Sequence, residues 1–184
     1  FYLNWLEDFY LTKSYYFIVV FFLIWLFIVF KALLAYRQHV RNFIKIHLKA
    51  FIITFMLSIF VFCSIGRYYR VLNDEIALLS VARSMSVQHR VDFVTEAQIR
   101  NGILTPTQSI IEIRPFLFPF FTHLFHLLLG YHPENVFLLN FFALWGLLFA
   151  AYLFVLPYVT FLWAIIATLL LLSQPIILLI ATSG

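Results

Sequence analysis

An acidic pair, Asp74 and Glu75, follows an apolar segment and opens a long polar stretch of the chain. A carboxylate held at the boundary of a membrane is costly to dehydrate, so an acidic pair fixed there is suited to proton transfer or to ion handling. The pair also suits a simpler structural role, because carboxylates in the first turn of a helix stabilise it by about 0.3–1 kcal/mol each through the helix dipole. Both interpretations predict a helix that begins at about Asp74, with Asn73 as its cap.

Three arginines are candidates for binding an anionic substrate. Arg67 and Arg70 precede the acidic pair, and Arg114 stands directly before a second apolar run. A guanidinium group can pair with a phosphate through two parallel hydrogen bonds. The alternative is that these arginines are interfacial anchors, because Arg67 and Arg70 flank two tyrosines and such residues are common at membrane surfaces.

Two histidines, His123 and His126, have the i, i+3 spacing that can place metal ligands on one face of a helix. His132 follows them, and Glu134 is the only acid after Arg114. These residues do not complete a usual set of metal ligands. We therefore expect interfacial histidines and no metal site.

The elements that must position these residues are membrane helices. Of the 184 residues, 64% are hydrophobic and 11% are charged, and the mean hydropathy is +0.99. Residues 135–184 contain no Asp, Glu, Lys or Arg, and a run of that length cannot form a water-soluble surface. We predict an all-α fold, a polytopic transmembrane helical bundle with interfacial amphipathic helices in its first outward loop. The composition excludes the water-soluble class, and we expect no nucleic-acid partner.

Four segments are predicted to cross the membrane, and they are residues 16–35, 50–66, 136–156 and 158–180. The stretch between the first two, from Lys31 to Lys49, carries five basic residues and no acid. The positive-inside rule places this stretch in the cytoplasm. The loop over residues 66–114 then lies on the outer side of the membrane.

An amphipathic helix over residues 74–89 is expected at the start of this outward loop, lying on the membrane interface. Its apolar face would carry Leu78, Val81, Ala82 and Met85, and the other faces would carry most of Ser80, Arg83, Ser84 and Ser86. The later part of the loop, from Arg100 to Gln108, contains Gly102 and Pro106 and is expected to be a flexible segment.

Residues 115–130 are expected to form a short interfacial or re-entrant helix. The segment has sixteen residues. It reaches only about 24 Å as a helix, which is less than a hydrocarbon core of about 30 Å. If this helix lies flat, the end of the chain from Ser173 onward emerges on the outer side; if it spans, that end is cytoplasmic. The length favours the flat arrangement.

The order of these features resembles the GT-C superfamily of membrane glycosyltransferases, which includes bacterial aminoarabinose transferases and protein O-mannosyltransferases. In that superfamily an outward loop opens with an Asp-Asp or Asp-Glu pair and continues as an alanine-rich amphipathic helix, and the residues here are Asn-Asp74-Glu75-Ile-Ala-Leu-Leu-Ser-Val-Ala-Arg-Ser-Met85. A basic residue and a proline then open a short apolar helix, here Arg114-Pro-Phe-Leu-Phe-Pro-Phe-Phe-Thr-His-Leu-Phe-His-Leu-Leu-Leu-Gly130. The resemblance covers Ile59 to Gly184.

The resemblance implies an inverting glycosyltransferase that moves a sugar from a polyprenyl-phosphate donor to an acceptor hydroxyl at the outer membrane face. It implies that Asp74 is the general base and that Glu75 positions the acceptor or supports Asp74. It implies that Arg114 stabilises the leaving phosphate, and Arg67 and Arg70 are further candidates for substrate binding.

The partners implied are membrane lipid, the polyprenyl-phosphate sugar donor, and a glycan, lipid or protein as acceptor. We expect no cofactor beyond the lipid-linked donor, and a requirement for a divalent metal stays open. The expected location is the bacterial inner membrane, as a multi-pass protein with its active face outward.

Two other functions stay open on the sequence. A transporter or channel would use Asp74 and Glu75 as an outer cation site, although the predicted spans hold almost no ionisable residues. A non-catalytic membrane assembly module would use the pair only to start a helix. We expect residues 1–184 to be the N-terminal part of one transmembrane domain in a larger protein, with the rest of the active site beyond Gly184, so that these residues alone would be inactive.

Overall fold

The protein is mostly helical. The computed structural model describes residues 2–67, 69, 73–100, 103–111 and 114–183; inside helices and strands it leaves out the side chains of residues 2–8, 73–75, 97, 100, 103–106 and 111. The described part contains seven helices and one two-stranded antiparallel sheet. The prediction of a helical fold class is confirmed, and the polytopic bundle stays a prediction.

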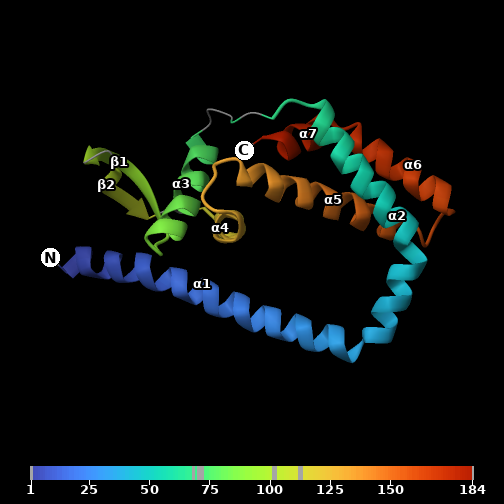
Figure 1. Cartoon of the computed structure of the whole chain (residues 1–184), viewed down its shortest axis with the longest axis horizontal. Helices are drawn as coiled ribbons and strands as arrows, with labels where there is room; N and C mark the ends of the chain where they lie inside the picture. The colour runs from blue at the N-terminus through green and yellow to red at the C-terminus, as the bar shows by residue number, and fades with distance from the viewer. Residues whose placement is uncertain (1, 68, 70–72, 101–102, 112–113, 184) are drawn as a thin grey trace. The chain divides into compact units, whose positions relative to one another are not determined.

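Two compact units make up the fold. The first unit consists of Phe1–Lys31 and Val71–Val136, and the second consists of Ala32–Arg70 and Phe137–Gly184. Each unit has its own buried apolar core. Figure 1 shows the order of the elements along the chain.

The first two helices are longer than predicted. Helix α1 covers Tyr2–Ala35 and helix α2 covers Arg37–Ser64, so only Tyr36 separates them. The basic stretch expected as a cytoplasmic connection is therefore itself helical. The physical reason is that this stretch contains no Gly or Pro and is rich in residues that favour helix, such as Ala, Leu, Lys and Arg.

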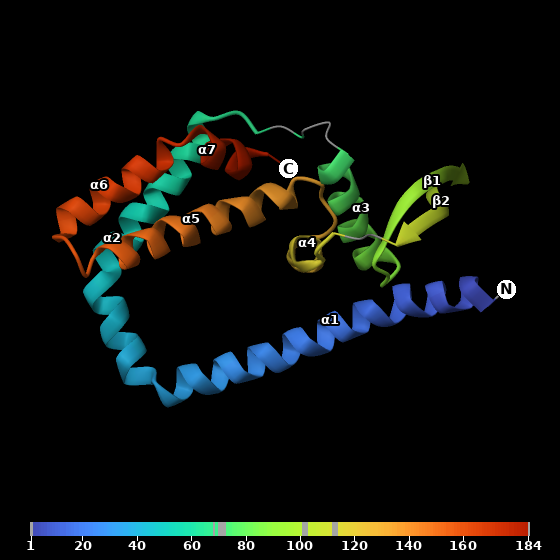
Figure 2. The same cartoon turned by 180° about the vertical axis from the view of Figure 1, so that it is seen from behind.

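The segment over residues 66–114 contains a β-hairpin that was not predicted from the sequence. After helix α3 (Asn73–Val87), strand β1 (Asp92–Arg100) pairs with strand β2 (Ile103–Ile111) in antiparallel register. The expected flexible segment over residues 100–108 thus lies largely in strand, and Pro106 lies in β2 opposite Ala97. Proline is tolerated there because a two-stranded sheet has only edge strands, whose outward backbone groups need no sheet partner. Strand β1 and helix α3 lie side by side in both views (Figures 1 and 2).

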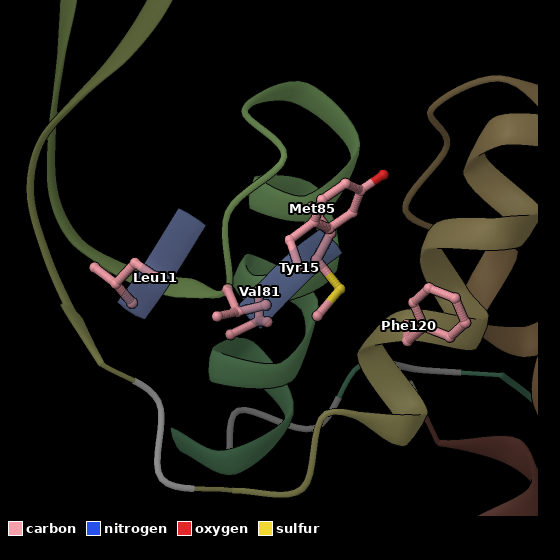
Figure 3. Packing of buried hydrophobic residues seen from close by; sticks show 6 residues of the cluster. Leu11, Tyr15, Val81, Met85 and Phe120 are labelled. Carbon is pink, nitrogen blue, oxygen red and sulfur yellow. The ribbon is translucent and has the colours of Figure 1, made fainter. Parts of the chain in front are cut away.

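Helix α4 (Leu117–Leu129) completes the first unit and packs against α3. The buried core of this unit gathers side chains from α1, α3 and α4, as Figure 3 shows for Leu11, Tyr15, Val81, Met85 and Phe120. Val91 belongs to the same core, and its backbone N–H donates to the carbonyl oxygen of Leu11 at 3.1 Å. The segment between α3 and β1 is thereby tied to α1.

The second unit contains α2, most of α5 (Asn135–Val155), α6 (Phe161–Leu172) and α7 (Pro175–Thr182). The span over residues 158–180 stays a prediction, and in this region α6 and α7 are two helices bent by 71°. Pro175 is the first residue of α7. Proline lacks the N–H that would continue the α6 hydrogen-bond ladder, and it favours the first position of a new helix.

Aromatic and small side chains hold the second unit together. The rings of Phe51 and Phe55 in α2 contact Trp145 of α5 with centroids 4.5 and 5.0 Å apart. Ala50 and Ala164 are fully buried where α2 and α6 meet this core. Small residues at such contacts let apolar helices approach closely, which is the usual mode of packing in membranes.

Three of the described helices are long and apolar enough to cross a membrane: Phe9–Ala35 within α1, Arg37–Ser64 and Asn135–Val155. The bent pair α6–α7 would be a fourth if it forms one broken span. Helix α4 is shorter, with 13 residues, and is not among these candidates. The chain is therefore a membrane protein by the length and composition of its helices.

Candidate functional site

The acidic pair lies in the first turn of helix α3. This helix begins at Asn73, so Asp74 and Glu75 are its second and third residues. Their side chains, and that of Asn73, lie outside the described residues. The backbone position alone puts both residues in the first turn of the helix, at the positive end of its dipole.

The three predicted arginines are distributed over different parts of the structure. Arg114 lies at the bend that leads through Pro115 into α4, it is half-buried, and it belongs to the same unit as Asp74. Arg67 is exposed in the segment after α2 and belongs to the other unit. Arg70 lies outside the described residues. The first unit thus holds the acidic pair together with Arg114, on α3 and at the start of its packing partner α4.

The apolar face of α3 is covered by protein. Val81, Ala82 and Met85, which were predicted to share this face, are fully buried, and Ala77 joins them. Ser84, which was predicted to lie on another face, is also buried, with 3% of its surface exposed. This side of α3 therefore faces protein, and Val81 and Met85 belong to the core that α3 shares with α1 and α4.

Two side-chain hydrogen bonds at the buried His123 join α1, α3 and α4. The hydroxyl of Tyr15 lies 3.2 Å from His123 Nε2, and the hydroxyl of Ser86 lies 2.9 Å from His123 Nδ1. Ser86 uses its only proton to donate to the carbonyl oxygen of Ala82 at 2.9 Å. It follows that His123 donates through Nδ1–H to Ser86 and that Nε2 accepts from Tyr15, which fixes a neutral imidazole.

The environment of His123 favours this neutral form. Burial lowers the pKa of His123 from 6.5 to about 4, with smaller contributions from His126 and His89. The charged form would lose hydration on burial, which is the main cause of the shift. At neutral pH the side chain therefore acts as a hydrogen-bonded link between helices.

His126 has a structural role one turn further along α4. Its Nδ1 accepts from the amide nitrogen of Asn135 at 2.9 Å, and the same nitrogen donates to the carbonyl oxygen of Gly130 at 2.9 Å. Burial lowers the pKa of His126 as well, with His132 adding to the effect. These contacts close the connection from α4 to α5.

Both histidines, which were expected to be interfacial, have side chains that are buried within the protein. Their exposed fractions are 1% for His123 and 5% for His126. Within the described residues, no group of three His, Cys, Asp or Glu side chains is arranged to hold a metal ion. The i, i+3 spacing of the two histidines places both on the buried face of α4, where they take part in packing.

A second polar group fastens the hairpin to α3. Asp92, at the start of β1, is 2% exposed, accepts from the hydroxyl of Ser84 and lies 3.4 Å from Arg90 Nε. The backbone N–H of Val94 donates to Ser80 Oγ at 3.1 Å. The sequence does not indicate this arrangement. Serines on a helix, followed within twelve residues by an aspartate, are common in surface segments and do not predict a buried contact.

Comparison of the chain with known protein families, with curated proteins and with solved structures found no match to any of them.

Proposed function

We propose that the protein is an integral-membrane glycosyltransferase that moves a sugar from a polyprenyl-phosphate donor to an acceptor hydroxyl at the outer membrane face. The observation that carries the proposal is the placement of Asp74 and Glu75 in the first turn of α3, in the unit where α3 packs on α4 and Arg114 leads into α4. The residues proposed as base and as phosphate-binding group thus belong to one unit, on α3 and before its packing partner α4. The resemblance of the two segments to the GT-C superfamily supports the same assignment.

In the proposed reaction, the Asp74 carboxylate takes the proton of the acceptor hydroxyl as that oxygen attacks the anomeric carbon of the donor. The bond between the anomeric carbon and the phosphate oxygen breaks, and the electron pair leaves with the polyprenyl phosphate. Arg114 stabilises the negative charge that develops on this leaving group. A single displacement of this kind inverts the anomeric centre. Glu75 positions the acceptor or supports Asp74.

The first prediction concerns the base. In the full-length protein Asp74→Asn keeps the size of the side chain and removes its ability to accept a proton, so sugar transfer should fall by about 10²–10⁴-fold. The measurement is the initial rate of transfer from a radiolabelled polyprenyl-phosphate sugar in membranes that contain equal amounts of each variant. Glu96→Gln, an exposed acid on β1, is the matched control and should keep the original rate. Full activity of Asp74→Asn would show that another group is the base.

The second prediction concerns the donor site. Arg114→Ala should raise the KM for the lipid-linked donor more than the KM for the acceptor, because it removes a two-point contact with phosphate. Arg114→Lys keeps the charge and loses the planar fork, so its donor KM should be intermediate. Equal increases of both KM values would instead assign Arg114 to the general structure of the unit.

A further inference from the structure

We propose that one face of helix α2 is a binding site for an anionic phospholipid of the membrane. Four cations, Arg37, Arg41, Lys45 and Lys49, recur at four-residue spacing on this uninterrupted helix, and all four are exposed. Four residues turn a helix by about 40° beyond one full turn, so the cations fall within an arc of about 120°. The chain has no Asp or Glu between Asp8 and Asp74 to balance them. The result is a continuous cationic stripe.

The stripe points away from the rest of the second unit. The opposite face of α2 carries Ala50 and Thr54, which are both fully buried, and His47, whose Nδ1 lies 3.4 Å from the Tyr152 hydroxyl of α5. At about 100° per residue, the centre of this buried face lies roughly 160° around the helix from the centre of the stripe. The four cations therefore face the surroundings of the unit.

The same exposed face continues as an apolar surface beyond Lys49. Ile52, Met56 and Phe60 again follow four-residue spacing, and 48%, 55% and 67% of their surfaces are exposed. One side of a single helix thus presents cations at its beginning and apolar side chains along the remainder. A soluble anion would use only the first part, whereas a phospholipid matches both parts through its headgroup and its acyl chains.

The length of α2 places the cations at headgroup level. Its 28 residues extend about 42 Å, roughly 12 Å more than a hydrocarbon core of about 30 Å. Side chains on a helix lean toward its N-terminus, so Lys45 and Lys49 reach back toward the layer that contains Arg37 and Arg41. Basic groups at such a position attract anionic lipid.

The test uses the protein in nanodiscs that contain equal amounts of phosphatidylcholine and phosphatidylglycerol with identical acyl chains. Lipids that stay bound after mild release are counted by native mass spectrometry. We expect phosphatidylglycerol to be enriched over phosphatidylcholine, and Arg41→Gln/Lys45→Gln to lower this enrichment by roughly fivefold or more, since each basic group near a membrane surface contributes about that factor. Arg41→Lys/Lys45→Arg should keep the enrichment, and Lys13→Gln, an exposed lysine on α1, is the matched control.

Two measurements on the unmodified protein test lipid binding independently of the variants. Raising the salt from about 0.1 M to about 1 M shortens the Debye length from about 10 Å to about 3 Å and should reduce the enrichment. Inorganic phosphate added at constant ionic strength should not displace phosphatidylglycerol. Equal retention of both lipids, unchanged enrichment in Arg41→Gln/Lys45→Gln, or displacement by phosphate alone would each overturn the proposal. None of these outcomes depends on sugar transfer.

Discussion

At the scale of single residues, His123 of α4 links three helices of the first unit. It bonds to Tyr15 of α1 and to Ser86 of α3, and its ring packs near Phe120 of its own helix. A neutral imidazole can serve both bonds at once, because it has one donor and one acceptor nitrogen. The stability of this unit should therefore depend on the protonation of one buried side chain.

The third prediction is that the first unit loses stability as pH falls from about 6.5 to about 4. The pKa of His123 is lowered to about 4 in the folded state, so between these values the unfolded chain binds a proton that the folded chain does not. Stability is then complete above the unfolded pKa and decreases by up to about 3 kcal/mol as pH approaches 4. The measurement is hydrogen exchange of α3 and α4 amides at pH 7, 6, 5 and 4.5, corrected for the intrinsic effect of pH.

His123→Gln should reduce this pH dependence, because glutamine offers a donor and an acceptor and does not titrate in this range. The part that comes from His126, whose pKa is also lowered by burial, should remain. The substitution should also lower the stability at pH 7, since the geometry of the two bonds is changed. His39→Gln, at an exposed position on α2, is the control and should leave the pH profile of α3 and α4 as it was. An unchanged profile in His123→Gln would mean that other groups determine the acid sensitivity.

At the scale of elements, the hairpin is held in the first unit by polar contacts to α3 and by Phe93 of β1, which packs against the apolar core. Ser80 accepts from the Val94 backbone, and Ser84 donates to Asp92, which also pairs with Arg90. A two-stranded hairpin by itself is only marginally stable in water. Its order should consequently depend on this docking.

The fourth prediction follows from the burial of Asp92. Asp92→Asn preserves the shape of the side chain and removes the charge that pairs with Arg90, so the docking of the hairpin should weaken by about 1–3 kcal/mol. Hydrogen exchange of the β1 and β2 amides should become faster, while exchange of α2 and α5 stays the same. Glu96→Gln removes an exposed charge from the same strand and should change neither. Uniform acceleration in both units would point to a general loss of folding instead.

At the scale of the whole molecule, the candidate spans decide which segments share a side of the membrane. Helix α2 is long enough to cross once, with its basic end at Arg37 and its apolar end at Ser64. The positive-inside rule predicts a cytoplasmic start of α2 and, after one crossing, an outward hairpin. This sidedness is what the proposed outward site requires.

The fifth prediction tests that crossing. In a Cys63→Ser background, His39→Cys and Glu96→Cys place single thiols at exposed positions on α2 and β1. A membrane-impermeant maleimide added to intact cells should label Glu96→Cys at once and His39→Cys only after the membrane is permeabilised. Cys63→Ser alone should remain unlabelled in both conditions. Simultaneous labelling of both positions in intact cells would contradict the single crossing and the outward placement of Asp74.

The sequence by itself determined the class of the protein and the positions of its main helices. Long apolar segments lie in the membrane, where no water is present to bond with the backbone. A helix satisfies its backbone hydrogen bonds internally, so these segments form helices. The periodic apolar face of α3 was likewise readable, since Val81, Ala82 and Met85 are buried together. Helical spacing alone determines which side chains share a face.

Only the tertiary structure decided what those faces meet. Contacts between residues that are separated in sequence, or that form no recognisable sequence pattern, determine three features. These are the hairpin, the burial of Ser84 and Asp92, and the hydrogen bonds of His123. The composition also did not predict the 71° bend between α6 and α7, because the segments before and after this bend are both apolar. Sequence periodicity shows which residues share one face of a helix. The element that packs against this face is determined by packing and hydrogen bonding between segments that are distant in sequence.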